Sequence, residues 1–179
     1  MVVLLLVLFA TGAVDIGGGS DSDSDGPTSA TNSGGSTNAA DSKLTQAILE
    51  PVDGGDAEGT ALFGTIGKNV VLQVTAEGLE PTPQGQSYSI WLYRSPKLVL
   101  RVGAAKVGEN GQLAAQLPIP AQLLAYVANG AFNQIAVSLL SEQEYKSALA
   151  AAKERKQLPG YLGEDTLRGQ IVGPAIEAK

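Results

Sequence analysis

Two residue types that carry much of protein chemistry are missing from this chain of 179 residues, which contains no histidine and no cysteine. Catalysis of the Ser-His-Asp and Cys-His kinds, thiolate zinc sites and disulfide frameworks are therefore excluded. Any reaction would have to depend on carboxylates, lysines or hydroxyl groups. A fold without cysteine is compatible with the cytosol and with the cell envelope, so this absence alone decides no compartment.

Aromatic residues are scarce as well, at 5% of the chain, and Trp91 is the single tryptophan. It lies in residues 86–95, QSYSIWLYRS, where strand alternation places Trp91 and Tyr93 on one face and Tyr88 on the other. A lone tryptophan in a small β domain is more often a packing residue, because its large apolar area favours burial. The alternative is a ring open to a ligand, and Trp91, Tyr93 and Tyr88 are then the candidate contacts with a partner or ligand.

The excess of acidic residues is concentrated in the first part of the chain. The formal net charge is −6, but five of the 18 acidic residues lie in residues 1–43, where Lys43 is the only basic residue. Residues 44–179 hold the other 13 acidic side chains and 11 basic ones. This part is nearly neutral and lacks the basic footprint of a nucleic-acid-binding protein, so we expect no nucleic-acid partner.

The chain begins with an uncharged apolar run, residues 2–14, VVLLLVLFATGAV. This run is too short for a helix that crosses roughly 30 Å of hydrocarbon, which takes ~20 residues. It lacks the Lys or Arg that opens a secretory signal, although small residues at 10, 12 and 13 suit a cleavage site. We interpret residues 1–14 as an N-terminal hydrophobic helix, either a signal or anchor or the remnant of a transmembrane helix that begins before Met1.

Residues 15–43 have the composition of a disordered linker. Gly, Ser and Asp make up 18 of the 28 residues from 15 to 42, so almost nothing in this segment can be buried. As a Gly/Ser coil it would span on the order of 30 Å. Residues 21–26, DSDSDG, match the first half of a calcium-binding EF-hand loop, but Asn32 stands where a bidentate Glu is needed. A solvated acidic spacer is the preferred interpretation, and we expect no metal site.

Residues 44–179 are predicted to form one mainly β domain. Apolar and alternating runs separated by Gly, Pro and Asn predict eight strands, at Thr45–Pro51, Gly59–Thr65, Asn69–Glu77, Ser87–Arg94, Leu98–Val107, Gln112–Leu117, Gln134–Leu140 and Thr166–Val172. Eight short strands at this spacing predict an immunoglobulin-like antiparallel β-sandwich. Tight turns are expected at residues 66–69 and 109–111.

One or two peripheral helices are expected beside these strands. Pro120 suits the first turn of a helix at Ala121–Ala128. Ser141 and Glu144 form a capping box for a second helix at Glu142–Gln157. A cationic cluster, Lys153, Arg155 and Lys156, lies in the last turn of this helix, where the helix dipole favours positive charge. The alternative for this cluster is a partner-binding basic patch.

The residues around Trp91 also carry a resemblance to a known family. A strand that ends in Gly78-Leu79 is followed by a Pro-containing turn ending in Gly85, and then by the stretch from Tyr88 to Leu92, YSIWL. This pattern resembles the extracytoplasmic domain of anti-sigma-K-type anti-sigma factors. The resemblance covers about residues 58–140, and its motif residues specify a β-sandwich more than a chemistry.

The resemblance implies a single-pass bacterial membrane protein that regulates transcription by holding a sigma factor inactive. In such a protein the folded domain is extracytoplasmic and receives a signal or restrains proteolysis, so an envelope signal protein or a regulatory protease is the implied partner. This chain departs from the family because it has no cytosolic sigma-binding part. We expect that part upstream of Met1, and the helix from Glu142 with residues 157–163 is an insertion beyond the family core.

A secreted or surface β-sandwich that binds carbohydrate or protein is the alternative function. Sparse aromatic residues argue against a sugar-stacking platform. An enzyme is not expected, because Glu164-Asp165 and the Glu77/Glu80 pair are the only carboxylate groupings of note, and both lie where turns and strand ends are commonly acidic. We therefore expect no catalytic residues and no cofactor.

Overall fold

The computed structural model describes residues 44–173. They form eight strands and two helices, which are β1 (Gln46–Pro51), β2 (Glu58–Ile66), β3 (Asn69–Glu77), β4 (Gln86–Ser95), β5 (Leu98–Ala105), β6 (Leu113–Ile119), α1 (Ala121–Ala128), β7 (Gln134–Ser141), α2 (Glu142–Glu154) and β8 (Glu164–Gln170). The hydrophobic segment at 1–14, the linker at 15–43 and the half calcium loop lie outside the described residues. Neither α1 nor α2 has the length and hydropathy of a membrane span.

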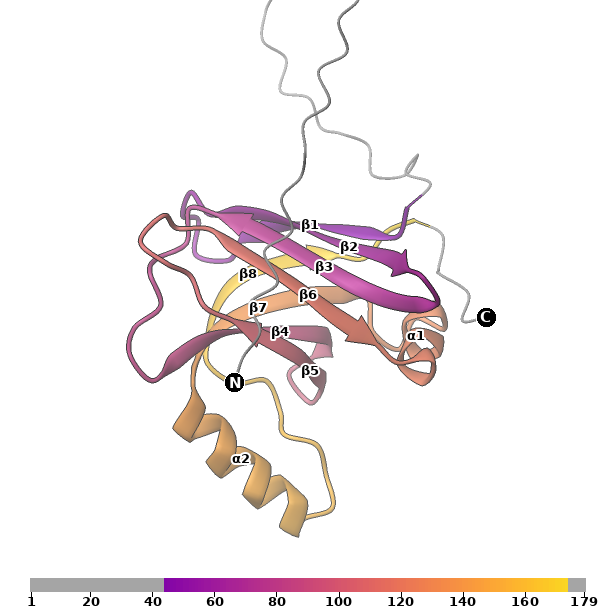
Figure 1. Cartoon of the computed structure of the whole chain (residues 1–179). Helices are drawn as coiled ribbons and strands as arrows, with labels where there is room; N and C mark the ends of the chain where they lie inside the picture. Colours follow the sequence, from indigo (N-terminus) through magenta and orange to yellow (C-terminus); the bar gives the residue numbers. More distant parts are fainter. Residues whose placement is uncertain (1–43, 174–179) are drawn as a thin grey trace, which may run out of the picture. The chain divides into compact units, whose positions relative to one another are not determined.

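All eight strands belong to one antiparallel sheet that nearly closes on itself (Figure 1). The strand order is β5-β4-β7-β8-β1-β2-β3-β6. The two end strands, β5 and β6, approach each other without being hydrogen-bonded neighbours. The mainly β class with two helices is therefore confirmed, and each strand begins and ends within two residues of its predicted bounds.

β1 joins the two halves of this sheet. Its residues Gln46–Leu49 pair with β2, whereas Glu50 and Pro51 pair with β8. Where β1 changes partner, it runs so close to β8 that Gly169 of β8 has no room for a side chain. A Cβ on Gly169 would lie 2.0 Å from the carbonyl oxygen of Ile48. A glycine at this position allows one strand to serve both halves.

The main core fills the interior of the sheet. Strand β3 shows how it is built, because Leu72, Val74 and Ala76 are buried while the residues between them face outward. This period of two is the pattern that the sequence predicted. The core continues through inward residues of the other strands, including Leu49, Phe63, Tyr88, Ile90, Leu92, Ile135, Val137 and Leu167.

The turns and helices also follow their local signals. Gly67 and Gly111 both adopt positive φ angles, at 61° and 69°, in the two predicted tight turns. Helix α1 has its predicted bounds. Helix α2 ends at Glu154 instead of Gln157, because Lys156 takes a left-handed conformation and the Gln157 amide then donates back to the Ala152 carbonyl. This geometry closes the C-terminus of the helix.

We predict that Gly169→Ala lowers the free energy of unfolding by about 1–3 kcal/mol, because the new methyl group meets backbone that cannot move aside. Gly64→Ala in β2 is the matched control, since a Cβ at Gly64 has no atom within 4 Å. The control should leave stability unchanged or raise it by up to about 1 kcal/mol. Urea unfolding of both variants measures the difference, and equal effects would contradict the close approach.

Candidate functional site

The candidate site is the outer face of β4 and the segment that covers it. Trp91 and Tyr93 point away from the main core and form a second apolar cluster, the outer cluster, with Val99, Ala136, Leu140, Tyr145, Tyr161 and Leu162. Helix α2 and the chain that returns from it to β8, residues 142–163, supply the last three of these and are called the cover (Figure 1). Trp91 is 1% exposed beneath the cover. The packing interpretation of the single tryptophan is confirmed.

Two tyrosines of the cover contact the indole ring. Tyr145 of α2 meets Trp91 edge to face, with ring centroids 6.4 Å apart. Tyr161 lies 5.4 Å from Trp91 and 5.3 Å from Tyr93, so a single ring of the cover contacts both aromatic residues of β4. Aromatic pairs in these arrangements stabilise by about 0.5–1.5 kcal/mol beyond the burial of their area.

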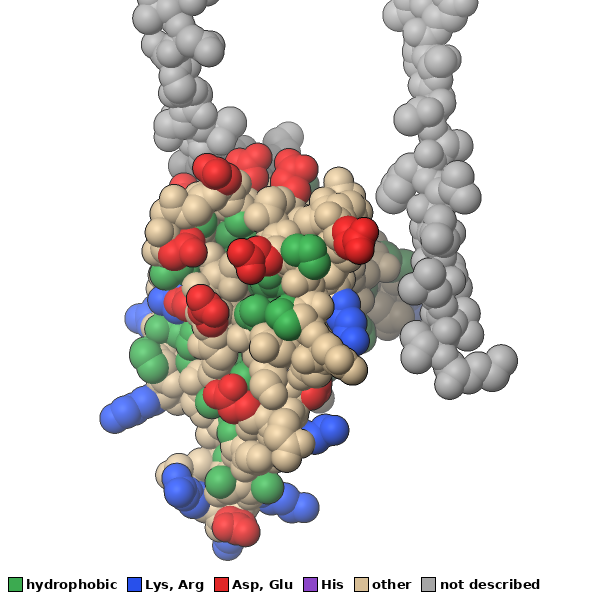
Figure 2. All heavy atoms as spheres, turned by 90° about the vertical axis from the view of Figure 1, so that its left-hand side faces the viewer, with side chains coloured by type: hydrophobic (Ala, Val, Ile, Leu, Met, Phe, Trp, Pro, Cys, Tyr) green, Lys and Arg blue, Asp and Glu red, His purple; other side chains and the backbone are tan. Residues whose placement is uncertain are grey.

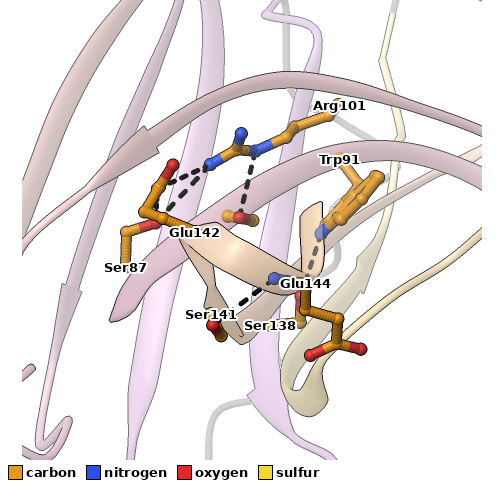
Figure 3. A network of polar contacts seen from close by, with 8 residues as sticks. Ser87, Trp91, Arg101, Ser138, Ser141, Glu142 and Glu144 are labelled. Carbon is orange, nitrogen blue, oxygen red and sulfur yellow. Dashed lines mark hydrogen bonds and ion pairs between the residues drawn. The ribbon is translucent and has the colours of Figure 1, made fainter. Parts of the chain in front are cut away.

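A buried hydrogen-bond chain ties the same ring to the cover. The Trp91 indole N–H donates to Ser138 Oγ at 2.9 Å, and the Ser138 hydroxyl donates to the carbonyl oxygen of Leu162 at 2.7 Å. Ser138 is fully buried in β7. The two hydrogen bonds therefore satisfy the Trp91 indole N–H and the Leu162 carbonyl oxygen, which would be costly to bury without partners. Trp91 and Ser138 are seen together in Figure 3.

A polar network holds the beginning of α2 against the sheet (Figure 3). Glu142 accepts hydrogen bonds from Ser87 at 2.6 Å and from Arg101 at 3.3 Å. The Arg101 guanidinium also donates to Ser89 Oγ at 3.1 Å and lies over the Tyr145 ring, 4.0 Å from its centroid. One arginine thus contacts both the polar and the aromatic side of the helix.

A second arginine holds the returning chain. Arg168 of β8 lies 4.1 Å from the centroid of the Tyr93 ring and forms an ion pair with Asp165. Tyr161 donates to the same carboxylate at 2.7 Å. Burial raises the pKa of the Tyr161 hydroxyl, and its bond to Asp165 raises it further, so this tyrosine stays protonated and donates at neutral pH.

The structure separates the three predicted contact residues. Trp91 and Tyr93 are brought together in the outer cluster, whereas Tyr88 points into the main core from the opposite face of β4. The Tyr88 hydroxyl donates to the carbonyl oxygen of Glu80 at 2.9 Å, and burial, with Glu80 and Glu164 nearby, raises its pKa. All three rings are buried in this structure. A role in direct contact stays a prediction that requires the surrounding segments to move.

Acidic residues line a hollow of about 250 Å³ beside Tyr88. Its lining includes Asp53, Asp56, Glu80 and Glu164. In residues 44–173, no group of three or more acidic side chains is arranged to hold a metal ion. Of the adjacent carboxylates noted in the sequence, Asp165 is engaged with Arg168 and Glu164 lines this hollow.

The sequence does not indicate which residues pack around Trp91 and Tyr93. Tyr145, Tyr161, Arg101 and Arg168 receive no role from the sequence alone. Their signal is weak because the pairs are far apart in the chain, with Arg101 and Tyr145 on β5 and α2. An alternating strand that carries both aromatic and serine side chains on its outer face, as at Ser89 and Trp91, is the one available hint that something covers that face.

The arrangement is suited to holding a segment in place. It contains rings, two arginine clamps and a buried hydroxyl relay, and the main core lies on the other side of β4. The cover can therefore be altered without directly disturbing the interior of the sheet.

We predict that Trp91 emits at a blue-shifted wavelength and resists quenching by iodide, because its ring is buried. A Trp91 that iodide quenches readily in the unmodified protein would contradict the covered site.

Ser138→Ala should lower the free energy of unfolding by about 1–3 kcal/mol, since the indole N–H loses its acceptor. Ser147→Ala on the exposed side of α2 is the control and should change stability by less than about 0.5 kcal/mol.

The Glu142 network predicts a pH dependence. The hydrogen bond from Ser87, followed by the charge of Arg101, holds the pKa of the Glu142 carboxyl below its ordinary value of 4.5. A carboxyl with a lowered folded-state pKa stabilises the fold above its unfolded pKa, and this contribution is lost as pH falls through the folded pKa. Glu142→Gln should therefore reduce Tm at pH 7, by on the order of 2 °C for a partly exposed pair.

The difference between the wild type and Glu142→Gln should shrink as the pH falls below about 4.5. Thermal unfolding at pH 7 and at lower pH measures it, with Glu144→Gln on the same helical turn as the control for a change of charge. A Tm difference that is the same at every pH would show that Glu142 acts through packing alone.

Comparison of the chain with protein-family models, with curated proteins and with solved structures finds no match.

Proposed function

We propose that residues 44–179 are the extracytoplasmic regulatory domain of a membrane-anchored anti-sigma factor. The domain acts by binding protein and not by catalysis. Its partners would be an envelope signal protein or a regulatory protease. The apolar run at residues 2–14 would attach the domain to the membrane, and residues 15–43 would serve as the linker between them.

The observation that carries this proposal is that the parts of the segment resembling the family, a strand, a turn and the next strand, contact one another in the fold. The segment from Leu72 to Leu92 contains most of β3, the connecting turn and most of β4. Gly78 and Gly85 adopt positive φ angles of 73° and 78° at the two ends of the turn. Tyr88 reaches back from β4 to hydrogen-bond the Glu80 carbonyl inside the turn. The Gly-Leu pair, the turn and the Tyr-x-x-Trp stretch thus depend on one another, which supports a recurring domain core.

We also infer that the nearly closed sheet is an immunoglobulin-like β-sandwich. One layer would contain β1, β2, β3 and β6, and the other β5, β4, β7 and β8. Two features support this division. β5 and β6 are not hydrogen-bonded to each other, and β1 changes partner along its length. Facing layers joined by one shared strand would account for both features.

The cover is the part of the domain best suited to receive a signal. It lies outside the segment that resembles the family and packs on its own small cluster. A carbohydrate platform is less well supported, because Trp91 and Tyr93 are buried and offer no open ring face for stacking. A protein that binds or cleaves the cover would alter the domain from its outer surface.

The test removes the codons for residues 44–173 from the chromosome of the source organism and measures all transcripts. We expect a sharp rise in the transcripts of one sigma factor's regulon, because an anti-sigma factor without its regulatory domain fails to restrain its sigma factor. A strain with Gly64→Ala in the intact gene serves as the control. Unchanged sigma-dependent transcription would reject the proposal.

The location of the domain is measured in the same cells. Glu109→Cys places a single thiol in an exposed turn of a chain that otherwise has none. A membrane-impermeant maleimide should label this variant in intact spheroplasts, and the unmodified chain provides the zero-background control. Labelling only after lysis would place the domain in the cytosol and contradict the extracytoplasmic assignment.

A further inference from the structure

The two ends of the sheet differ sharply in their surface chemistry. The chain enters the described structure at Leu44, and β1 then starts beside the end of β8, where Gln46 pairs with Val172. The same end holds the β2–β3 turn, the β4–β5 hairpin and α1 (Figure 1). We call it the entry end. The opposite end, where the β1–β2, β3–β4 and β5–β6 connections lie, α2 begins and β8 starts, is called the loop end.

Large apolar side chains are exposed at the entry end. Leu44, Ile66, Leu98 and Tyr126 come from four separate segments, and each is between 44% and 58% exposed. The hydrogen bond from Arg94 to the Gly130 carbonyl ties the end of β4 to the segment after α1. Exposed leucines and isoleucines gathered on one side of a domain are typical of an interaction surface.

The connections between strands differ in charge at the same two ends. The cover, which begins at the loop end and reaches the entry end where the Tyr161 amide donates to the Pro96 carbonyl, carries charges of both signs. Residues 44–45, 66–69, 95–98, 119–134 and 170–173 at the entry end include Lys68 and Lys97 and contain no acidic residue. The β1–β2, β3–β4 and β5–β6 connections with their adjoining strand ends, and the first residue of β8, carry Asp53, Asp56, Glu58, Glu77, Glu80, Glu109 and Glu164 against Lys106. Figure 2 looks onto the loop end and shows acidic side chains spread over it. The named entry-end segments therefore combine exposed apolar side chains with two lysines, whereas the loop end is mostly acidic and exposes one large apolar residue, Val52.

We propose that the entry end rests on an anionic lipid surface. The exposed apolar residues enter the interface, Tyr126 lies at headgroup depth, and Lys68, Arg94 and Lys97 face anionic headgroups. The acidic loop end and its hollow are repelled by the same surface and point away from it. The proposal rests on the membrane attachment stated under Proposed function and adds the orientation of the domain.

Leu44, where the described residues begin, lies at the entry end, and this favours a lipid surface over a second copy of the domain as the partner of that end. The polypeptide N-terminal to Leu44 leads through a short linker to the apolar run at 2–14, so the linker keeps the entry end at high effective concentration near the bilayer. A second copy using the same surface would place Lys68 and Lys97 of two domains close together without an acidic residue between them. Anionic headgroups supply the missing opposite charge.

The experiment uses the full chain reconstituted into vesicles of phosphatidylglycerol and phosphatidylcholine. Tyr126→Cys carries an environment-sensitive fluorophore at the entry end, and Gln84→Cys carries it in the exposed β3–β4 turn as the matched control. A nitroxide-labelled lipid reports contact. We expect at least a twofold stronger quenching at position 126 than at position 84, and loss of this difference in high salt or in Lys68→Glu/Lys97→Glu.

The outcomes separate the inference from the function on which it rests. If the chain floats with the vesicles but the probe at 126 remains unquenched, the orientation is wrong while the membrane attachment stands. If the chain does not float with the vesicles, the attachment fails, and the orientation fails with it. Equal quenching in pure phosphatidylcholine overturns the role of charge. A blue shift at 126 that depends on protein concentration without vesicles identifies a second copy and overturns the lipid contact. Unchanged Trp91 emission verifies that each variant is folded.

Discussion

The burial of β4 on both faces is the constraint on which the rest of the structure depends. Its inner face supplies Tyr88, Ile90 and Leu92 to the main core, and its outer face supplies Trp91 and Tyr93 to the outer cluster. A strand covered on one side only would leave a tryptophan and a tyrosine open to water. The cover is therefore required by the composition of β4, and its two arginine clamps and hydroxyl relay fix where it lies.

Division of the apolar residues into two clusters gives the domain two levels of stability. The main core is held by strands that are neighbours around the whole sheet, so it can be lost only by global unfolding. The outer cluster depends on one helix, one returning segment and a few polar contacts near the surface. Elements of this kind open at lower free energy than the core. The proposed regulatory contact at the cover and the proposed lipid contact at the entry end therefore involve different parts of one small domain.

Much of the secondary structure could be predicted because its signals are local. The alternation in β3, the glycines in the turns and Pro120 before α1 each act within a few residues, and all correspond to the observed elements. The end of α2 was misplaced by three residues because Lys156, a residue with no particular turn preference, adopts the left-handed conformation. The partners of Trp91 could not be found from the sequence, since Ser138, Tyr145 and Tyr161 reach it only through the fold.

The sequence by itself determined which segments are strands, where they turn, that no histidine or thiol chemistry is available, and that Trp91 shares a face with Tyr93. These properties follow from side-chain period, backbone preference and composition. Only the tertiary structure decided which face of β4 is inner, that β1 serves both halves of the sheet, and that the acidic connections between strands collect at one end. Those outcomes depend on strand order and on contacts between distant residues, which local patterns do not encode.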